Sequence, residues 1–229
     1  MNLREKILKA SFLSGACHIG SALSCVEIIE AVYEYKSPKD IFIFAKASGV
    51  ATLYCYLHPL EKAWKYLKKY PLPNRKVPGV IWSGGSLGQG LSVAVGIALA
   101  DRTRKVYCLI SDGELQEGQT QEALMFARHH ELSNLICIID NNVFQSIGKT
   151  SKILKVCDYS FGIDGHNNAA IKKSFNTITN HFKLIQANTV KGKGVDFMEY
   201  NNDWHYNNLD ETKLKEAILQ VANKKSKKR

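Results

Sequence analysis

The sequence of 229 residues has no long hydrophobic run, and its longest apolar stretches are as short as Leu135 to Ile139. A helix that spans a bilayer needs about 20 consecutive apolar residues. The first twelve residues, MNLREKILKASF, carry charges throughout and lack the apolar core of a secretory signal peptide. We therefore expect no membrane-spanning segment and a cytoplasmic location.

Paired cysteines are also missing, because none of the six cysteines forms a C-x-x-C motif. Most lie in apolar surroundings, which favours small buried side chains in a reducing compartment over a zinc site or a disulfide framework. The six are Cys17, Cys25, Cys55, Cys108, Cys137 and Cys157.

Extremes of composition are absent too, with 45% hydrophobic and 23% charged residues. These values exclude disordered, collagen-like and coiled-coil chains. The formal net charge is +10, and five of the positive charges lie in the last six residues, 224–229. We expect these residues to form a solvated basic tail. The other Lys and Arg residues are scattered and match no nucleic-acid-binding motif, so an acidic partner or phosphorylated substrates are favoured over nucleic acid.

Short apolar segments alternate with amphipathic ones along residues 1–223. Uniformly apolar strands between helices are typical of a parallel sheet covered on both faces, so we expect one α/β domain with a mostly parallel sheet. Strands are expected at 41–44, 106–110, 135–139 and 183–190. Helices are expected at 2–14, 26–33, 49–69 with a break at Pro59, 91–100, 122–130, 167–177 and 211–222, with Ser24 capping the second and Glu27 completing a capping box.

Polar residues follow two of the expected strands. Asp112 and Gly113 come after the strand at 106–110, and Asn141 and Asn142 come after the strand at 135–139. Ligands of open α/β sheets bind beyond the carboxyl ends of strands, where these oxygens suit Mg²⁺ or Ca²⁺ bound together with a diphosphate. Zinc prefers sulfur and nitrogen. Each pair alone is also a common turn sequence.

Longer motifs carry a family resemblance. A G-D-G element followed about 25–30 residues later by N-N is the thiamine-diphosphate fingerprint, here with Ser111 in place of the first glycine. In the family's order, over residues 4–206, the sequence resembles the N-terminal, diphosphate-binding half of transketolase. The segments are CHIGSALSCVEIIEAVY, SGGSLGQGLSVAVGIALA, SDGELQEGQTQEA, DNNVFQSIGKT, TVKGKGVDFME and DWH.

The resemblance implies a site for thiamine diphosphate and Mg²⁺. It assigns the metal to Asp112, the side chain of Asn142 and the backbone carbonyl of Phe144. The implied cofactor-binding residues are Gly85, Leu87, Asp112, Gly113, Glu114, Asn142 and His205. The implied catalytic residues are His18 and His205, together with Glu117 and Glu122 of a carboxylate network that links two active sites across the dimer.

Structural roles remain the alternatives for several of these residues. His18 could cap a turn, His205 could be a packed surface residue, and Glu117 and Glu122 could lie on a solvated helix face. The glycines of the KGKG segment, Gly192 and Gly194, could simply form a loop.

The sequence departs from the family in three ways. No pyrimidine-binding domain follows residue 206, so we expect a heterotetramer with a separately encoded C-terminal subunit. Ser48 and Leu72 stand where the family has substrate-channel histidines, and the region after Cys157 looks contracted. We therefore expect a two-carbon ketol transfer between small sugar or sugar-phosphate substrates in an altered pocket. The alternatives are one chain of a thiamine-dependent 2-oxo acid decarboxylase or carboligase, or a non-catalytic cofactor-binding scaffold.

Overall fold

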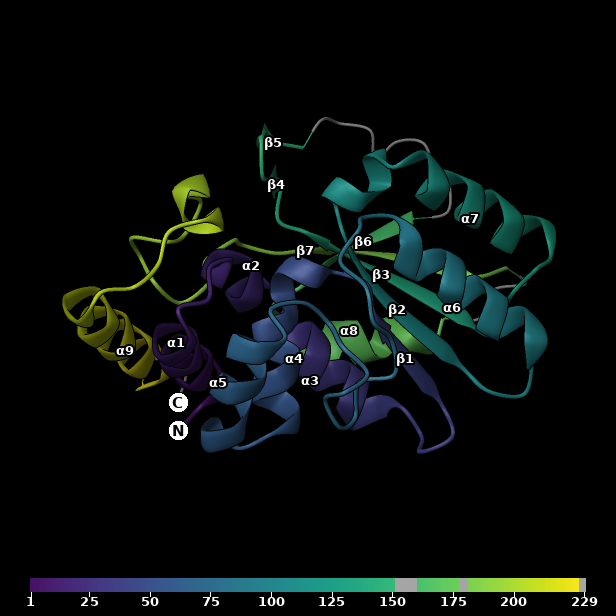
Figure 1. Cartoon of the computed structure of the whole chain (residues 1–229). Coiled ribbons are helices and arrows are strands. Elements are labelled where there is room, and N and C mark those ends of the chain that lie inside the picture. Colours follow the sequence, from purple (N-terminus) through teal and green to yellow (C-terminus); the bar gives the residue numbers. More distant parts are fainter. Residues whose placement is uncertain (151–159, 178–180, 227–229) are drawn as a thin grey trace.

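The computed structural model describes residues 1–150, 160–177 and 181–226. Its main sheet has five strands in the order β1-β2-β3-β7-β6, and every neighbouring pair is parallel. Helices cover both faces of this sheet, as Figure 1 shows, which confirms the expected α/β class. The strands are β1 (Ile41–Phe44), β2 (Val106–Ser111), β3 (Leu135–Asn141), β6 (Ser160–Asp164) and β7 (Lys183–Asn188).

The strands are apolar because both of their faces are buried. In β2, Val106, Cys108 and Ile110 point into one hydrophobic cluster, whereas Tyr107 and Leu109 point into the other. This alternation follows from the two-residue period of a strand. Burial of both faces removes the polar positions that a half-exposed strand would show.

The helices divide between the two clusters. Helices α6 (Gln89–Ala100) and α7 (Gly118–His129) lie together over one face, beside the sheet in Figure 1. The other face is covered by a larger group, in which α1 contacts α4, α5 and α9, and α3 contacts α4 and α8. These helices are α1 (Leu3–Ser14), α2 (Ile19–Ser24), α3 (Val26–Tyr35), α4 (Val50–Leu57), α5 (Leu60–Lys69), α8 (Asn168–Phe175) and α9 (Glu211–Ser226).

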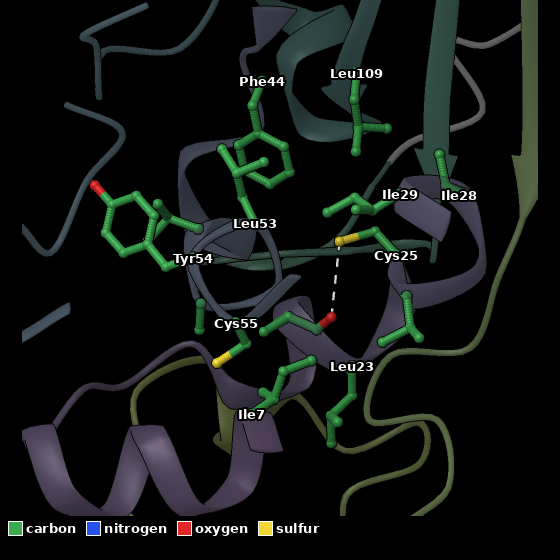
Figure 2. Packing of buried hydrophobic residues seen from close by; sticks show 14 of the residues in the cluster. Ile7, Leu23, Cys25, Ile28, Ile29, Phe44, Leu53, Tyr54, Cys55 and Leu109 are labelled. Atoms are coloured by element: carbon green, nitrogen blue, oxygen red, sulfur yellow. Dashed lines mark hydrogen bonds between the residues drawn. The ribbon is translucent and has the colours of Figure 1, made fainter. Parts of the chain in front are cut away.

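Cysteines contribute to both clusters as small apolar side chains. Figure 2 shows Cys25 and Cys55 among Ile7, Leu23 and Phe44 in the larger cluster. Cys108 and Cys137 are buried in the other cluster, and Cys17 is half-buried. Cys157 lies outside the described residues, and the described part of the chain resumes at Ser160, the first residue of β6.

The prediction for the helix at 26–33 was wrong about the residue that caps its N-terminus. Ser24 ends the short helix α2 instead of capping α3, and Cys25 precedes α3 without a side-chain capping bond. The Ser24 hydroxyl instead donates to Asp140 at the end of β3. A tertiary hydrogen bond to a buried carboxylate has therefore replaced the local capping interaction.

The C-terminal helix is longer than expected. Helix α9 runs to Ser226, so Lys224 belongs to a helix and not to a solvated tail. Its ammonium group pairs with Asp196 and with Glu199, the latter at 3.3 Å. Residues 227–229 of the expected tail lie outside the described residues. Among the described helices, none is long and apolar enough to cross a bilayer.

A partly buried ion-pair network connects the N-terminal helix to the rest of the domain. Arg4 of α1 donates to both oxygens of Glu27 in α3, at 2.7 and 2.8 Å. His166 accepts a hydrogen bond from the Val190 amide through Nε2, so its Nδ1–H donates to Glu27 over 2.9 Å. Burial raises the pKa of Glu27, but the hydrogen bonds from His166 and Arg4 outweigh it and lower the pKa to about 2.

We expect Glu27 to make folding stability depend on pH. A carboxyl whose pKa falls from 4.5 to about 2 on folding stabilises the protein above pH 4.5. The shift corresponds to about 3 kcal/mol, which is lost as the pH falls toward 2. Urea unfolding should show that Glu27→Gln loses about this much at pH 7 and progressively less between pH 4.5 and pH 3.

The matched control is Glu5→Gln, which breaks the i,i+4 pair between Glu5 and Lys9 on the surface of α1. Such pairs contribute only about 0.2–0.5 kcal/mol. A loss of stability in Glu27→Gln that is equally small, or that does not change with pH, would contradict the assigned network.

Candidate functional site

A cavity of about 250 Å³ lies at the carboxyl ends of β1, β2 and β3, beside the N-terminal end of α6. This is the edge at which parallel α/β sheets bind ligands. The cavity brings together segments that are far apart in the sequence. Its lining residues are His18, Ser21, Lys46, Ala47, Ser48, Leu72, Gly85, Leu87, Ser111, Gly113, Asn142, Phe144, Gln145, Ser146, His205 and Tyr206.

Asp112 is buried at the end of β2, directly before Gly113. Its carboxylate accepts hydrogen bonds from the Thr150 hydroxyl and the Gly113 amide, each over 3.1 Å. Both of these donors are neutral. Burial first, and then the negative charge of Asp140, raise the pKa of Asp112 to about 6.

Asn142 and Phe144 lie in a tight turn after β3. The Asn142 amide nitrogen donates to Asp140 over 3.2 Å, and the Asn142 amide oxygen accepts from the Phe144 N–H over 3.2 Å. Val143 between them adopts a left-handed conformation with φ of 62°. A β-branched residue is costly in this region, so the turn is held by its surroundings.

A divalent cation fits this donor set. A buried carboxylate without a cationic hydrogen-bond donor, close to a second carboxylate, leaves negative charge that such an ion would neutralise. Nowhere in the described residues do three His, Cys, Asp or Glu side chains cluster for metal binding. A cation here would rely on the Asn142 amide oxygen and a backbone carbonyl, which suits Mg²⁺ better than zinc.

Beneath this turn lies a fully buried ion pair between Lys46 and Asp140. Their charged atoms are 2.9 Å apart, and their side chains are 1% and 0% exposed. Asp140 also accepts from Ser24, Thr189 and Asn142, while Lys46 donates to the Ser21 carbonyl over 2.6 Å. Burial opposes both charges, but each partner offsets it, which lowers the pKa of Asp140 and raises that of Lys46.

The loop before α6 forms another wall of the cavity. A Cβ atom at Gly85 would lie only 2.5 Å from Cδ1 of Leu72, so a larger residue there would force the Leu72 side chain to move. Glu114 is completely buried and does not line the cavity. It accepts from the Ser111 amide at 2.8 Å and, weakly, from the Gly88 amide at 3.5 Å. Glu114 therefore connects the loop to β2, and its role as a cofactor-binding residue stays a prediction.

His18 and His205 meet at the cavity. Their rings pack edge to face with centroids 4.7 Å apart, and the His18 amide donates to the His205 carbonyl over 3.1 Å. Burial lowers the pKa of His18. Burial, followed by the charges of Lys191, His18 and Lys46, lowers the pKa of His205 to about 3. Both imidazoles are therefore neutral near pH 7.

Two glutamates predicted as catalytic lie elsewhere. Glu117 is half-buried at the N-cap of α7, and Glu122 is exposed on the same helix. Neither lines the cavity. Within a single chain the structure does not bring them to the other site residues.

Sequence reasoning missed several site residues. Lys46, Asp140 and Thr150 were not singled out, although AKASG and DNNVFQSIGKT contain them. Lys191 precedes the glycine of KGKG and contacts both Asn202 and His205. Ser48 and Leu72, where the sequence lacks the family's histidines, both line the cavity.

The fold and the site define a parallel α/β domain with a cavity at the carboxyl edge of its sheet, lined by both polar and apolar residues. The family described as "Transketolase, thiamine diphosphate binding domain" matches residues 14–225. The chain belongs to this family.

Relatives of similar length are named as subunits. A subunit of apulose-4-phosphate transketolase from Phocaeicola vulgatus is 30% identical over 257 residues, which cover 96% of this chain and 91% of that protein. The 6-deoxy-6-sulfo-D-fructose transketolase subunit SqwG of a Clostridium species is 32% identical over 256 residues, covering 96% of this chain and 93% of that protein.

Other relatives are much longer. Human transketolase is 30% identical to the chain, and the match covers 97% of the chain but 42% of that enzyme. The crystal structure of transketolase from Campylobacter jejuni aligns with a TM-score of 0.77 and 27% identity over 97% of this chain and 43% of that one. The chain thus spans less than half the length of these transketolases.

Proposed function

We propose that this chain is the thiamine-diphosphate-binding subunit of a two-chain transketolase. With Mg²⁺ and a partner chain, it transfers a two-carbon ketol unit between sugar or sugar-phosphate substrates. The observation that carries this proposal is the meeting of Asn142 and Phe144 with His18 and His205 at one cavity. Asp112 is buried between Ser111 and Gly113, which both line that cavity. Family membership supports the same cofactor.

The residues at the carboxyl ends of β2 and β3 would hold the cofactor's diphosphate through a metal ion. Asp112, the Asn142 amide oxygen and the Phe144 carbonyl would bind Mg²⁺, while Gly85, Leu87 and Gly113 line the cavity. When bound, thiamine diphosphate supplies the electron sink that stabilises a carbanion at the former carbonyl carbon.

Two neutral imidazoles serve the substrate in this proposal. His18 and His205 face the same cavity, and their lowered pKa values keep them uncharged near pH 7. A neutral imidazole both donates and accepts a hydrogen bond, so it can orient a substrate hydroxyl or carbonyl and move a proton at that oxygen.

A second chain completes the enzyme. The chain covers most of the relatives that are named subunits and less than half of human transketolase. We infer that the partner carries the pyrimidine-binding domain and that two copies of each chain form a heterotetramer. Glu117 and Glu122, which stand away from the cavity, then lie at the interface between active sites.

The substrate side of the cavity differs from the usual family pattern. Ser48 and Leu72 occupy lining positions where the family resemblance leads us to expect histidines. Serine and leucine cannot act as acid or base near neutral pH. We propose a specialised sugar substrate, in keeping with the unusual sugars named for the two subunit relatives.

The same replacements favour a second candidate, a thiamine-dependent 2-oxo acid decarboxylase or carboligase, whose donor needs no hydroxyl contacts. The two are distinguished by reconstituting the chain with its partner and supplying ketose phosphates or 2-oxo acids. We expect ketol transfer to an aldose acceptor without release of CO₂. Stoichiometric CO₂ from a 2-oxo acid, with no ketol transfer, would contradict the transketolase proposal, and Asp112→Asn provides the inactive control.

A further inference from the structure

The lysine that the sequence analysis did not single out, Lys191, lies directly behind His205. Its Nζ atom is 3.0 Å from His205 Nδ1 and 2.6 Å from Asn202 Oδ1. An ammonium group has only donors, so the ring nitrogen that it contacts must carry a lone pair. The proton of neutral His205 is then on Nε2.

We propose that Lys191 is a positioning residue that fixes His205 as the Nε2–H tautomer and so presents a hydrogen-bond donor to the cavity. The tautomer follows from the contact with the protonated amine of Lys191, whereas its value for catalysis rests on the proposed function. Lys191 does not itself line the cavity, so it acts through His205.

The packing around Lys191 leaves its side chain little freedom. The side chain is completely buried, and a Cβ atom at Gly20 would lie 3.1 Å from its Cγ atom. The adjacent Gly192 amide donates to the Gly20 carbonyl over 2.9 Å. Asn202 is held in turn, because its Nδ2 donates to the Gln145 carbonyl over 3.0 Å. The ammonium group is therefore directed at His205 from a fixed position.

The charge environment distinguishes Lys191 from Lys46, which is also completely buried. Lys46 has the carboxylate of Asp140 as its partner. The hydrogen-bond partners found for Lys191 are the neutral Asn202 amide and the neutral His205 ring. Burial, followed by repulsion from Lys46, lowers the pKa of Lys191 to about 8. A buried cation is costly unless it is hydrogen-bonded, and the two hydrogen bonds of Lys191 fix its ammonium group against Asn202 and His205.

Lys191 also keeps His205 neutral. Its positive charge opposes protonation of the ring, whose pKa is about 3. A neutral ring with its proton on Nε2 can donate to an oxygen that gains negative charge during the reaction. The opposite tautomer would present a lone pair to that oxygen and repel it.

Imidazole ¹⁵N spectra of the full chain test the tautomer without reference to turnover. We expect wild-type His205 to carry its proton on Nε2, and we expect Lys191→Met to populate the Nδ1–H form. Lys191→Arg, which keeps a cationic donor, should restore the Nε2–H form. The control is Lys193→Met, which removes a partly exposed lysine that is 3.7 Å from Glu199 and should leave the spectrum unchanged.

A proton on Nδ1 in wild-type His205, or an unchanged tautomer in Lys191→Met, would overturn the proposal. If Lys191→Met fails to fold, the wild-type spectrum alone still tests the proposal. These outcomes do not depend on whether the chain belongs to a two-chain transketolase, so the two proposals can fail separately.

Kinetics of the complex with the partner chain then measure the consequence. Loss of an outer-shell partner costs about 10–100-fold in activity, and we expect this loss in kcat. The KM and the Kd for thiamine diphosphate should change less than about threefold, because Lys191 lies outside the cavity lining. A large increase in the cofactor Kd with an unchanged kcat would instead identify Lys191 as a direct cofactor ligand and overturn its positioning role.

Discussion

Replacement of Asp112 by asparagine is expected to abolish the thermal stabilisation conferred jointly by Mg²⁺ and thiamine diphosphate. A ligand at 100 times its Kd stabilises the native state by about 2.7 kcal/mol. For a domain of this size that amounts to about 5–10 °C in Tm. Asn has almost the same shape but lacks the negative charge, so the loss would report on metal binding rather than on packing.

The same substitution should stabilise the ligand-free chain. Asp112 is buried near Asp140 with a pKa of about 6, so its ionised form destabilises the native state at pH 7. Because the folded-state pKa lies above the ordinary value of 3.8, this cost is present at pH 7 and disappears as the pH falls below 3.8. We expect Asp112→Asn to gain about 1–3 kcal/mol in urea unfolding at pH 7.

The control is Asp203→Asn, which alters an exposed carboxyl group. It should change neither the ligand-free stability nor the ligand-induced shift by more than about 0.5 kcal/mol. Retention of the full ligand-induced shift by Asp112→Asn would show that the cofactor does not depend on this carboxylate.

Lys46→Met is expected to be the most destabilising single substitution near the site. The variant leaves the Asp140 carboxylate buried without its cation, next to Asp112. Removal of one partner of a buried ion pair costs about 3–5 kcal/mol. Urea unfolding of the ligand-free chain at pH 7 measures this loss directly.

Lys9→Met is the matched control because Lys9 forms an ion pair with Glu5 on the surface of α1. Surface pairs contribute about 0–1 kcal/mol. If both lysine variants lost the same small amount, Lys46 and Asp140 would not form the buried pair on which the turn at Asn142 rests.

Much of the fold could be predicted because its signals are local. Strands β1, β2 and β3 are short apolar runs, and Pro59 marks the break between α4 and α5. Asp112 and Asn142 could be found because parallel strands end at one edge of the sheet. His18 and His205 could be identified only through the family resemblance, because neither the periodicity nor the composition of the sequence distinguishes them.

The remaining features depend on contacts between distant segments. Ser24 has the sequence context of a helix cap. Its hydroxyl instead donates a hydrogen bond to Asp140, which lies 116 residues away in the sequence. Strand β6 contains a glycine, and the hairpin of β4 (Phe144–Gln145) and β5 (Gly148–Lys149) is very short, so neither has a strong pattern. Lys46 and Lys191 look like surface lysines in the sequence and are completely buried in the fold.

Anomalous scattering from Mn²⁺ tests the central claim most directly. Crystals of the chain with its partner, grown with Mn²⁺ and thiamine diphosphate, should show one anomalous peak bound by Asp112, the Asn142 amide oxygen and the Phe144 carbonyl. The diphosphate should complete its coordination, as expected for a hard divalent cation. Thiamine diphosphate bound without a metal at these three groups, or a metal bound elsewhere in the cavity, would contradict the account.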